Sequence, residues 1–266
     1  MTALAPLTTR ALPTRKDEAW RYSDVDAAAR AWPLAEPDRI VVRAGEAAHR
    51  TMLQDVAASD VAIRDLVVEI GAGGIFGLHL LDMGGALGRV TIDVTLHEGA
   101  HFELNAALLG AGDQTIELVT RVTHAEPRAT SNQTVRAIAG GKATTSYLGQ
   151  VCVARDAQQT DAVQSFKAML LGRGATANAK PELEIFADDV KCAHGATVGE
   201  LDRQALFYLE SRGIGPDEAK GLLTRAFVAD ALDRVGNEKV REAFYADVEQ
   251  WFAPSPFVPS EVEGRV

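Results

Sequence analysis

The chain has 266 residues, of which 47% are hydrophobic, so it can bury a substantial core as one large or two small domains. Its formal net charge of −10 argues against a nucleic-acid-binding protein, which needs a basic face. No apolar run is long enough to cross a bilayer and no secretory leader begins the chain, so we expect a cytoplasmic protein without membrane contact.

The first segment, residues 1–37, is expected to be short and helical. A helix is predicted around residues 16–31, with Trp20, Tyr22 and Trp32 as anchors, and Pro33 and Pro37 end the segment.

Residues 38–200 are expected to form a β core. Apolar and polar residues alternate along residues 89–96 and again along residues 100–106, which is typical of strands with one buried face. Glycine pairs such as Gly140-Gly141 mark turns between the strands. Many short strands suit a sandwich, a barrel or a β-solenoid, and no repeat of fixed length decides among them.

Residues 201–254 are expected to form a C-terminal helical domain, and residues 255–266 a flexible tail. A proline, Pro216, stands where the first turn of a helix tolerates it, and apolar residues then recur at helical spacing. Gly236 separates this helix from a second one that ends before Pro254.

A cysteine and a histidine stand two residues apart near the end of the β core. In an extended segment Cys192 and His194 point to the same face. We expect Gly195 to turn the chain after them, and a short helix to run from Asp202 to Gly213. Two soft ligands make half a metal site, and the alternative is a buried cysteine beside a turn histidine.

The surrounding sequence resembles the C-terminal signature of the SufB/SufD family, whose members build iron–sulfur clusters. The matching stretches are Pro181-Glu182-Leu183, Ala187-Asp188-Asp189-Val190-Lys191, Cys192-Ala193-His194-Gly195-Ala196-Thr197-Val198-Gly199 and Leu206-Phe207-Tyr208-Leu209-Glu210-Ser211-Arg212-Gly213-Ile214. A second stretch, residues 12–23, resembles another recurrent family segment. Within the family, Cys-Ala followed by His-Gly-Ala-Thr-Val-Gly looks like the SufD branch.

The resemblance implies a mainly β fold, with a right-handed parallel β-helix between a short N-terminal helical segment and a C-terminal helical domain. It also implies a non-enzymatic, SufD-like accessory or scaffold subunit of a SufBCD complex. His194, with Cys192 as auxiliary, would then lie where the nascent cluster forms. A cluster usually takes four ligands, mostly thiolates, so the site must be shared with a SufB-like subunit.

The resemblance further implies that the C-terminal helices dock a SufC-like ATPase. The candidate docking residues are Leu206, Phe207, Arg212 and Phe227. ATP would then be bound only by that partner, and this chain alone would hold no tight cofactor. A homodimer is possible for the isolated chain.

Two expectations remain open at this level. A ligating Cys192 thiolate needs a lowered pKa, which we expect from the proximity of His194 and Lys191. SufB-type chains carry a functional cysteine in the strand equivalent to residues 164–171, and this chain has none there, which favours an accessory role. The alternative function is a structural β-solenoid adaptor without any metal ligand.

Three other motifs fit poorly. His97-Glu98-Gly99-Ala100-His101 matches the zinc peptidase pattern, but its flanks alternate as strands and predict a strand–turn–strand unit. The glycines of residues 71–77 lack the helix that a dinucleotide site requires, and Gly140-Gly141-Lys142 lacks a complete phosphate loop. The isolated histidines His49, His79 and His124 are expected at the surface or at strand ends.

Overall fold

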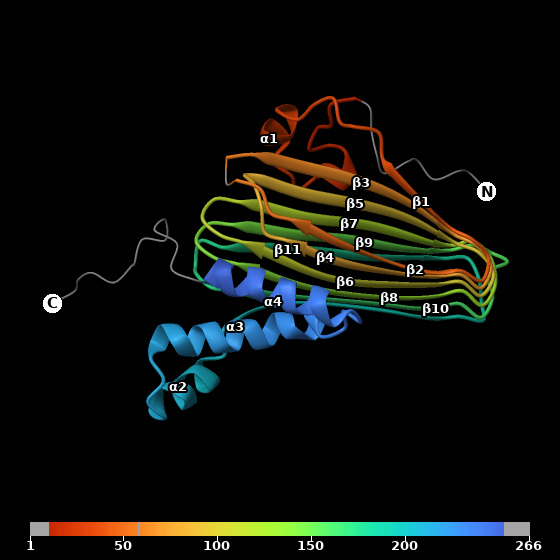
Figure 1. Ribbon diagram of the computed structural model, residues 1–266. Coiled ribbons are helices and arrows are strands. Elements are labelled where there is room, and N and C mark those ends of the chain that lie inside the picture. The colour runs from red at the N-terminus through yellow and green to blue at the C-terminus, as the bar shows by residue number, and fades with distance from the viewer. Residues whose placement is uncertain (1–10, 58, 253–266) are drawn as a thin grey trace.

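The computed structural model in Figure 1 describes residues 11–57 and 59–252 of the chain. It is mainly β, with short helices before the strands and three longer helices after them. The strands are β1 (Asp38–Val42), β2 (Ala47–Gln54), β3 (Val61–Ile70), β4 (Ile75–Asp82), β5 (Leu87–Leu96), β6 (His101–Gly110), β7 (Thr115–His124), β8 (Thr130–Ala139), β9 (Thr144–Val153), β10 (Asp161–Leu170), β11 (Thr176–Ile185) and β12 (Lys191–Glu200).

Consecutive strands alternate between two parallel sheets. One sheet has the order β1-β3-β5-β7-β9-β11 and the other β12-β10-β8-β6-β4-β2, so the chain winds as a β-solenoid of about six turns. The expected parallel β-helix is confirmed. The strands of the first sheet from β3 onward begin at residues 61, 87, 115, 144 and 176, so the turn length drifts between 26 and 32 residues. This drift explains why no fixed repeat is visible in the sequence.

The interior is filled by the inward-facing side chains of both sheets, which stack in register from turn to turn. Phe76 on β4 lies over Phe102 on β6 with ring centroids 6.2 Å apart, and both rings are buried. Leu78 and Leu104 form the next such pair. Burial of each such side chain contributes about 1.5–3 kcal/mol, so apolar stacking holds the solenoid together.

The N-terminal helix is shorter than predicted from residues 16–31. The structure has one 3₁₀ turn, η1 (Glu18–Trp20), and one short helix, α1 (Val25–Ala29). Trp20 anchors the segment, as expected: it is buried and packs edge-on against Trp32. The segment is held to the outer face of the first sheet by tertiary contacts around Trp20, and these contacts do not require a continuous helix.

Three helices follow the last strand: α2 (Arg203–Ser211), α3 (Pro216–Leu232) and α4 (Glu238–Phe252). Helices α3 and α4 pack through apolar residues such as Val228 and Phe244 against the outer face of the β4–β6–β8 sheet. Arg136 of β8 adds a polar tie, because its Nε donates to Asp230 of α3 at 2.8 Å. The predicted tail, residues 255–266, lies outside the described residues.

Helix α2 begins and ends as the sequence predicts. The Asp202 side chain accepts hydrogen bonds from the backbone of Gln204 and Ala205, and Gly213 follows the helix with a positive φ of 87°. None of its residues is buried, and Figure 1 shows it projecting away from the solenoid. In the described part of the chain, no helix combines the length and apolar character needed to span a bilayer.

Candidate functional site

Cys192 and His194 lie on β12, the last strand of the solenoid. This strand pairs with β10 alone, in parallel register, so that Cys192 lies beside Ala162 and His194 beside Gln164. Ala162 and Gln164 are buried inward-facing residues, and the two site residues therefore continue the inward face into the last turn. The sequence prediction that they share one face holds.

The prediction that Gly195 turns the chain is wrong. Strand β12 runs through Gly195 to Glu200 without a break. A side chain at Gly195 would meet no atom within 4 Å, so this glycine lies in an open, exposed stretch of strand. The thiol–imidazole pair is thus held on a regular strand and not at its end.

The last turn of the solenoid is open. In β10 the inward side chains of Phe166 and Ala168 are buried, whereas their counterparts in β12, Ala196 and Val198, are exposed. No further strand of the described chain covers them, and Ile185 of β11 is also exposed on the inward side. An unpaired strand edge beside exposed apolar residues is a surface suited to a partner protein.

The Cys192 thiol does not have the lowered pKa that the sequence led us to expect. Burial raises the pKa of Cys192, and the negative charge of Asp161 raises it further. These effects outweigh the backbone N–H of Ala162, which favours the thiolate. The expected influence of Lys191 and His194 fails because the cysteine packs into a small apolar cluster with its neighbours on the preceding turns. In the isolated chain this residue is therefore a thiol at neutral pH.

His194 is exposed at the open end, and no hydrogen bond to either of its ring nitrogens occurs within the described residues. A neutral imidazole ligates iron without further activation. Among the described residues, no three His, Cys, Asp or Glu side chains are arranged to hold a metal ion. The pair on β12 can therefore act as ligands only when another chain supplies the rest.

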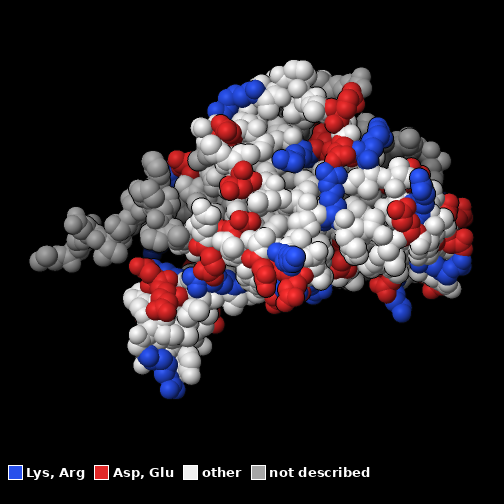
Figure 2. Space-filling model, viewed as in Figure 1, with Lys and Arg blue, Asp and Glu red and all other residues white. Residues whose placement is uncertain are grey.

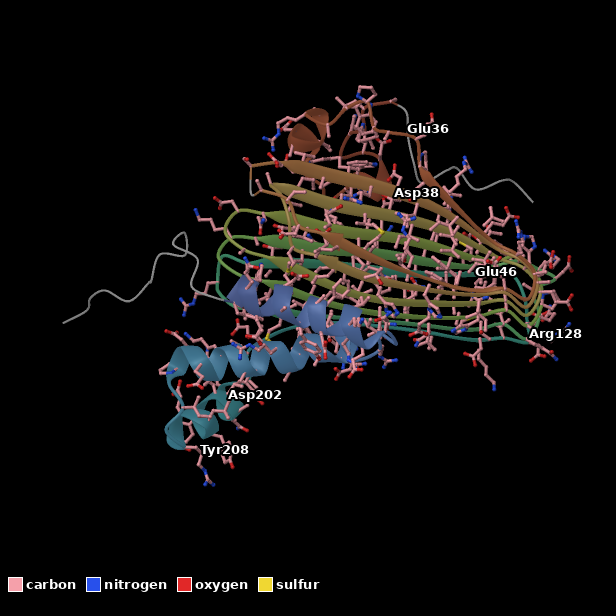
Figure 3. All side chains as sticks on the ribbon, in the orientation of Figure 1. Glu36, Asp38, Glu46, Arg128, Asp202 and Tyr208 are labelled. Atoms are coloured by element: carbon pink, nitrogen blue, oxygen red, sulfur yellow. The ribbon has the colours of Figure 1, made fainter. Side chains whose placement is uncertain are left out.

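Of the docking residues predicted in the helices, Phe207 is 73% exposed and Arg212 is exposed as well. Phe207 is followed on α2 by Tyr208, labelled in Figure 3 towards the end of the projecting helix, and the guanidinium of Arg212 lies 5.2 Å from the Tyr208 ring. Leu206 is half-buried, and Phe227 of α3 packs into the cluster that joins α3 and α4 to the sheet. The accessible part of this surface is thus mainly on α2.

The zinc peptidase motif is divided between strands, as predicted. His97 follows β5 and His101 begins β6, with Gly99 at a φ of 63° in the turn between them. His97 contacts Glu69 and Glu126, each at 3.1 Å, and these carboxylates raise its pKa. His101 instead bonds to a threonine on β8. The two imidazoles are therefore engaged separately and do not share one helical face.

The other glycine motifs are turns between strands, and one of the three histidines is placed differently from the prediction. Residues 71–74 connect β3 to β4, and residues 140–143 connect β8 to β9. His49 is exposed and His124 is the last residue of β7, as predicted, whereas His79 is buried in the middle of β4. His124 is buried too; it bonds to Ser131 at 2.9 Å, and burial lowers its pKa to about 4. His79 and His124 both work as structural residues of the sheets.

Figure 2 shows acidic and basic side chains interspersed over one face of the molecule, including the helical domain.

Comparison of the sequence with known protein families identifies the family of this chain. The family described as "SUF system FeS cluster assembly, SufBD core domain" matches residues 34–227. The chain belongs to the SufB/SufD family of iron–sulfur cluster assembly proteins.

Known relatives support this assignment. The chain is 32% identical to a chloroplastic protein of Arabidopsis thaliana over 76% of its own length and 43% of the relative. It is 32% identical to the iron–sulfur cluster assembly protein SufD of Escherichia coli, over 65% of this chain and 41% of SufD. It is 33% identical to an iron–sulfur cluster assembly SufBD family protein of Synechocystis, over 72% and 43%. The chain thus spans less than half the length of these relatives.

Proposed function

We propose that this SufBD family member is a SufD-like accessory or scaffold subunit that shares a nascent-cluster site with a SufB-like chain. The observation that carries the proposal is the open last turn, where Cys192 and His194 face the solenoid interior yet remain accessible. A partner that covers this end would meet both side chains. The cluster is cargo held between two chains, and this subunit contributes ligands and shape without catalytic turnover.

The SufB-like partner would bind along β11 and β12. The free edge of β12 offers unpaired backbone N–H and C=O groups, and Ile185 and Val198 offer apolar contact area. His194 is the primary ligand in this proposal. Cys192 is auxiliary, since its raised pKa means that the partner must first change its surroundings. We place this assembly in the cytoplasm.

The test replaces His194 with alanine and follows cluster incorporation by absorbance and electron paramagnetic resonance in the reconstituted complex. We expect incorporation to fall at least tenfold while the subunits still co-elute. His49→Ala is the matched control, because His49 is an exposed histidine on β2, the opposite edge strand of the same sheet. Normal cluster incorporation in an intact His194→Ala complex would refute the ligand role.

We also propose that helix α2 docks a SufC-like ATPase, which supplies ATP-driven movement. Phe207 and Tyr208 provide exposed aromatic area, and Arg212 adds a charge beside them. Arg212→Glu should weaken binding about tenfold in a titration with the ATPase. Arg203→Glu, an equal charge change at the other end of α2, is the control and should leave binding nearly unchanged. Equal effects of both substitutions would indicate general electrostatics and not a docking site.

The second candidate is a β-solenoid adaptor that only joins other proteins. The raised pKa of Cys192 favours a structural role for that residue. In an adaptor, neither Cys192 nor His194 would affect cluster formation, so the His194→Ala reconstitution separates the two functions directly.

A further inference from the structure

Polar side chains are buried in the apolar interior directly beneath His194. Gln133 of β8 accepts hydrogen bonds from Thr120 Oγ1 at 2.9 Å and from the Tyr147 hydroxyl at 3.2 Å. Gln164 of β10 is the next residue in register, and His194 of β12 follows it. We call these five residues the polar column.

The column is built into the core by its neighbours. Gly149 leaves the space that the Tyr147 hydroxyl occupies, because a Cβ at Gly149 would lie 2.3 Å from that oxygen. Phe166 stacks on the Tyr147 ring at 5.3 Å between centroids. Backbone and aromatic neighbours thus fix the position of this hydroxyl within the column.

Gln164 is the unexplained member of the column. Its residue is 1% exposed, yet neither Oε1 nor Nε2 has a hydrogen-bond partner within the described residues. Buried side-chain amides nearly always find partners, because desolvating them without a hydrogen bond is costly. One neighbour of Gln164 in the column is Gln133, whose Nε2 is also unpartnered, and the other is His194 at the open end.

We infer that Gln164 is a positioning residue for His194. Neither side chain is hydrogen-bonded within the described residues, and a turn of the exposed imidazole towards Gln164 lets Gln164 Oε1 accept the N–H of the ring nitrogen that then faces it. In-register neighbours on paired strands lie about 4.8 Å apart, which brings a glutamine amide within reach of the ring. A carbonyl oxygen has two lone pairs, so Oε1 can also accept from Gln133 Nε2 on its other side. The hydrogen bond fixes one tautomer and leaves the lone pair of the second ring nitrogen free to face the open end.

This arrangement deepens the proposed function and rests on it, because a ligating histidine generally donates its other ring N–H to an acceptor that orients it. The opposite polarity has the opposite consequence. If Gln164 Nε2 donated to the ring, the outward nitrogen would carry the proton and could not bind iron. The direction of the Gln164–His194 hydrogen bond therefore determines whether the outward ring nitrogen of His194 can bind iron.

The experiment measures the tautomer of His194 in the full chain by ¹⁵N NMR with labelled histidine, at a pH where the ring is neutral. Gln164→Met keeps the side-chain length but removes the acceptor, and we expect the ratio of the two tautomers to fall about fivefold. Gln150→Met is the control, because Gln150 faces outward on β9 and bonds to Glu184 at 3.4 Å. It should leave the His194 signals unchanged.

The tautomer of the unchanged chain tests the polarity, because an Oε1 acceptor places the proton on the ring nitrogen that faces Gln164. A proton on the outward ring nitrogen, or an unchanged ratio in Gln164→Met, would overturn the inference.

The tautomer measurement needs no cluster, so it tests the role of Gln164 independently of the proposed ligand role of His194. A tautomer that depends on Gln164, together with normal cluster incorporation in His194→Ala, would retain the hydrogen bond and reject the ligand role. The reverse pair of results would retain the ligand role and reject Gln164 as its positioning residue.

Discussion

Removing one partner of the buried ion pair between Arg89 and Glu117 should be among the most destabilising single substitutions in the fold. The guanidinium and the carboxylate are 2.8 Å apart, and each side chain is only 1% exposed. Arg89 also donates to the carbonyl of Ala19 at 2.7 Å and lies 3.8 Å from the Trp20 ring, which fastens the N-terminal segment to the sheet. Glu117→Leu leaves Arg89 buried without its partner, which should lower the free energy of unfolding by about 3–5 kcal/mol.

Replacing both Arg89 and Glu117 should lower the free energy of unfolding much less than replacing one of them. In Arg89→Met/Glu117→Leu no charge remains buried, and the loss should be about 1–2 kcal/mol, from the contacts to Ala19 and Trp20. Urea unfolding followed by tryptophan fluorescence gives the free energy of unfolding of the wild type, of Arg89→Met, of Glu117→Leu and of the double variant, which together form a double-mutant cycle. Asp38→Asn, at the exposed Arg50–Asp38 pair, is the control and should cost below about 1 kcal/mol. Single substitutions that simply add up in the double variant would refute the reasoning.

Three further changes test other parts of the structure. Burial raises the pKa of Asp82 to about 8, so between about pH 4 and 8 the native state holds a proton that the unfolded state has lost. Stability should therefore fall with rising pH by up to ~1.4 kcal/mol per unit, and Asp82→Asn should flatten this slope in urea unfolding at several pH values. Asp230→Asn should lower the free energy of unfolding by about 1–2 kcal/mol, because Asp230 is half-exposed but its partner Arg136 is buried. Amide hydrogen exchange in α3 should then accelerate, and unchanged exchange would contradict this. Gly149→Ala should cost about 1–3 kcal/mol by displacing the Tyr147 hydroxyl, and an unaltered unfolding midpoint would contradict the close approach.

Strand content could be predicted from the sequence, but the architecture could not be predicted from pattern alone. Alternation along residues 89–96 and 100–106 corresponds to β5 and β6. Alternation specifies one buried face and says nothing about which strands pair. The drifting turn length hid the repeat, and only the family resemblance distinguished a solenoid from a sandwich or a barrel.

The candidate site, too, could be predicted from the sequence only in part. The shared face of Cys192 and His194 followed from the period of a strand, whereas the direction of the Cys192 pKa shift depended on burial that only tertiary packing reveals. Gln164 was missed because its strand can be assigned to either face: Val163 is the more apolar neighbour, yet it points outward and is 41% exposed. Register with Cys192 and His194 is the signal that could have found it.

The same inward face is buried in β10 and exposed in β12, and this difference links partner binding to site formation. Ala196 and Val198 continue the positions of Phe166 and Ala168, so a partner that covers the open end would bury apolar surface of the kind that stabilises every earlier turn. The same contact would remove His194 from water and bring the missing ligands to it. In the proposed SufD-like function, binding and completion of the ligand set would then be one event, because one partner would supply both the apolar cover of the last turn and the ligands that Cys192 and His194 lack.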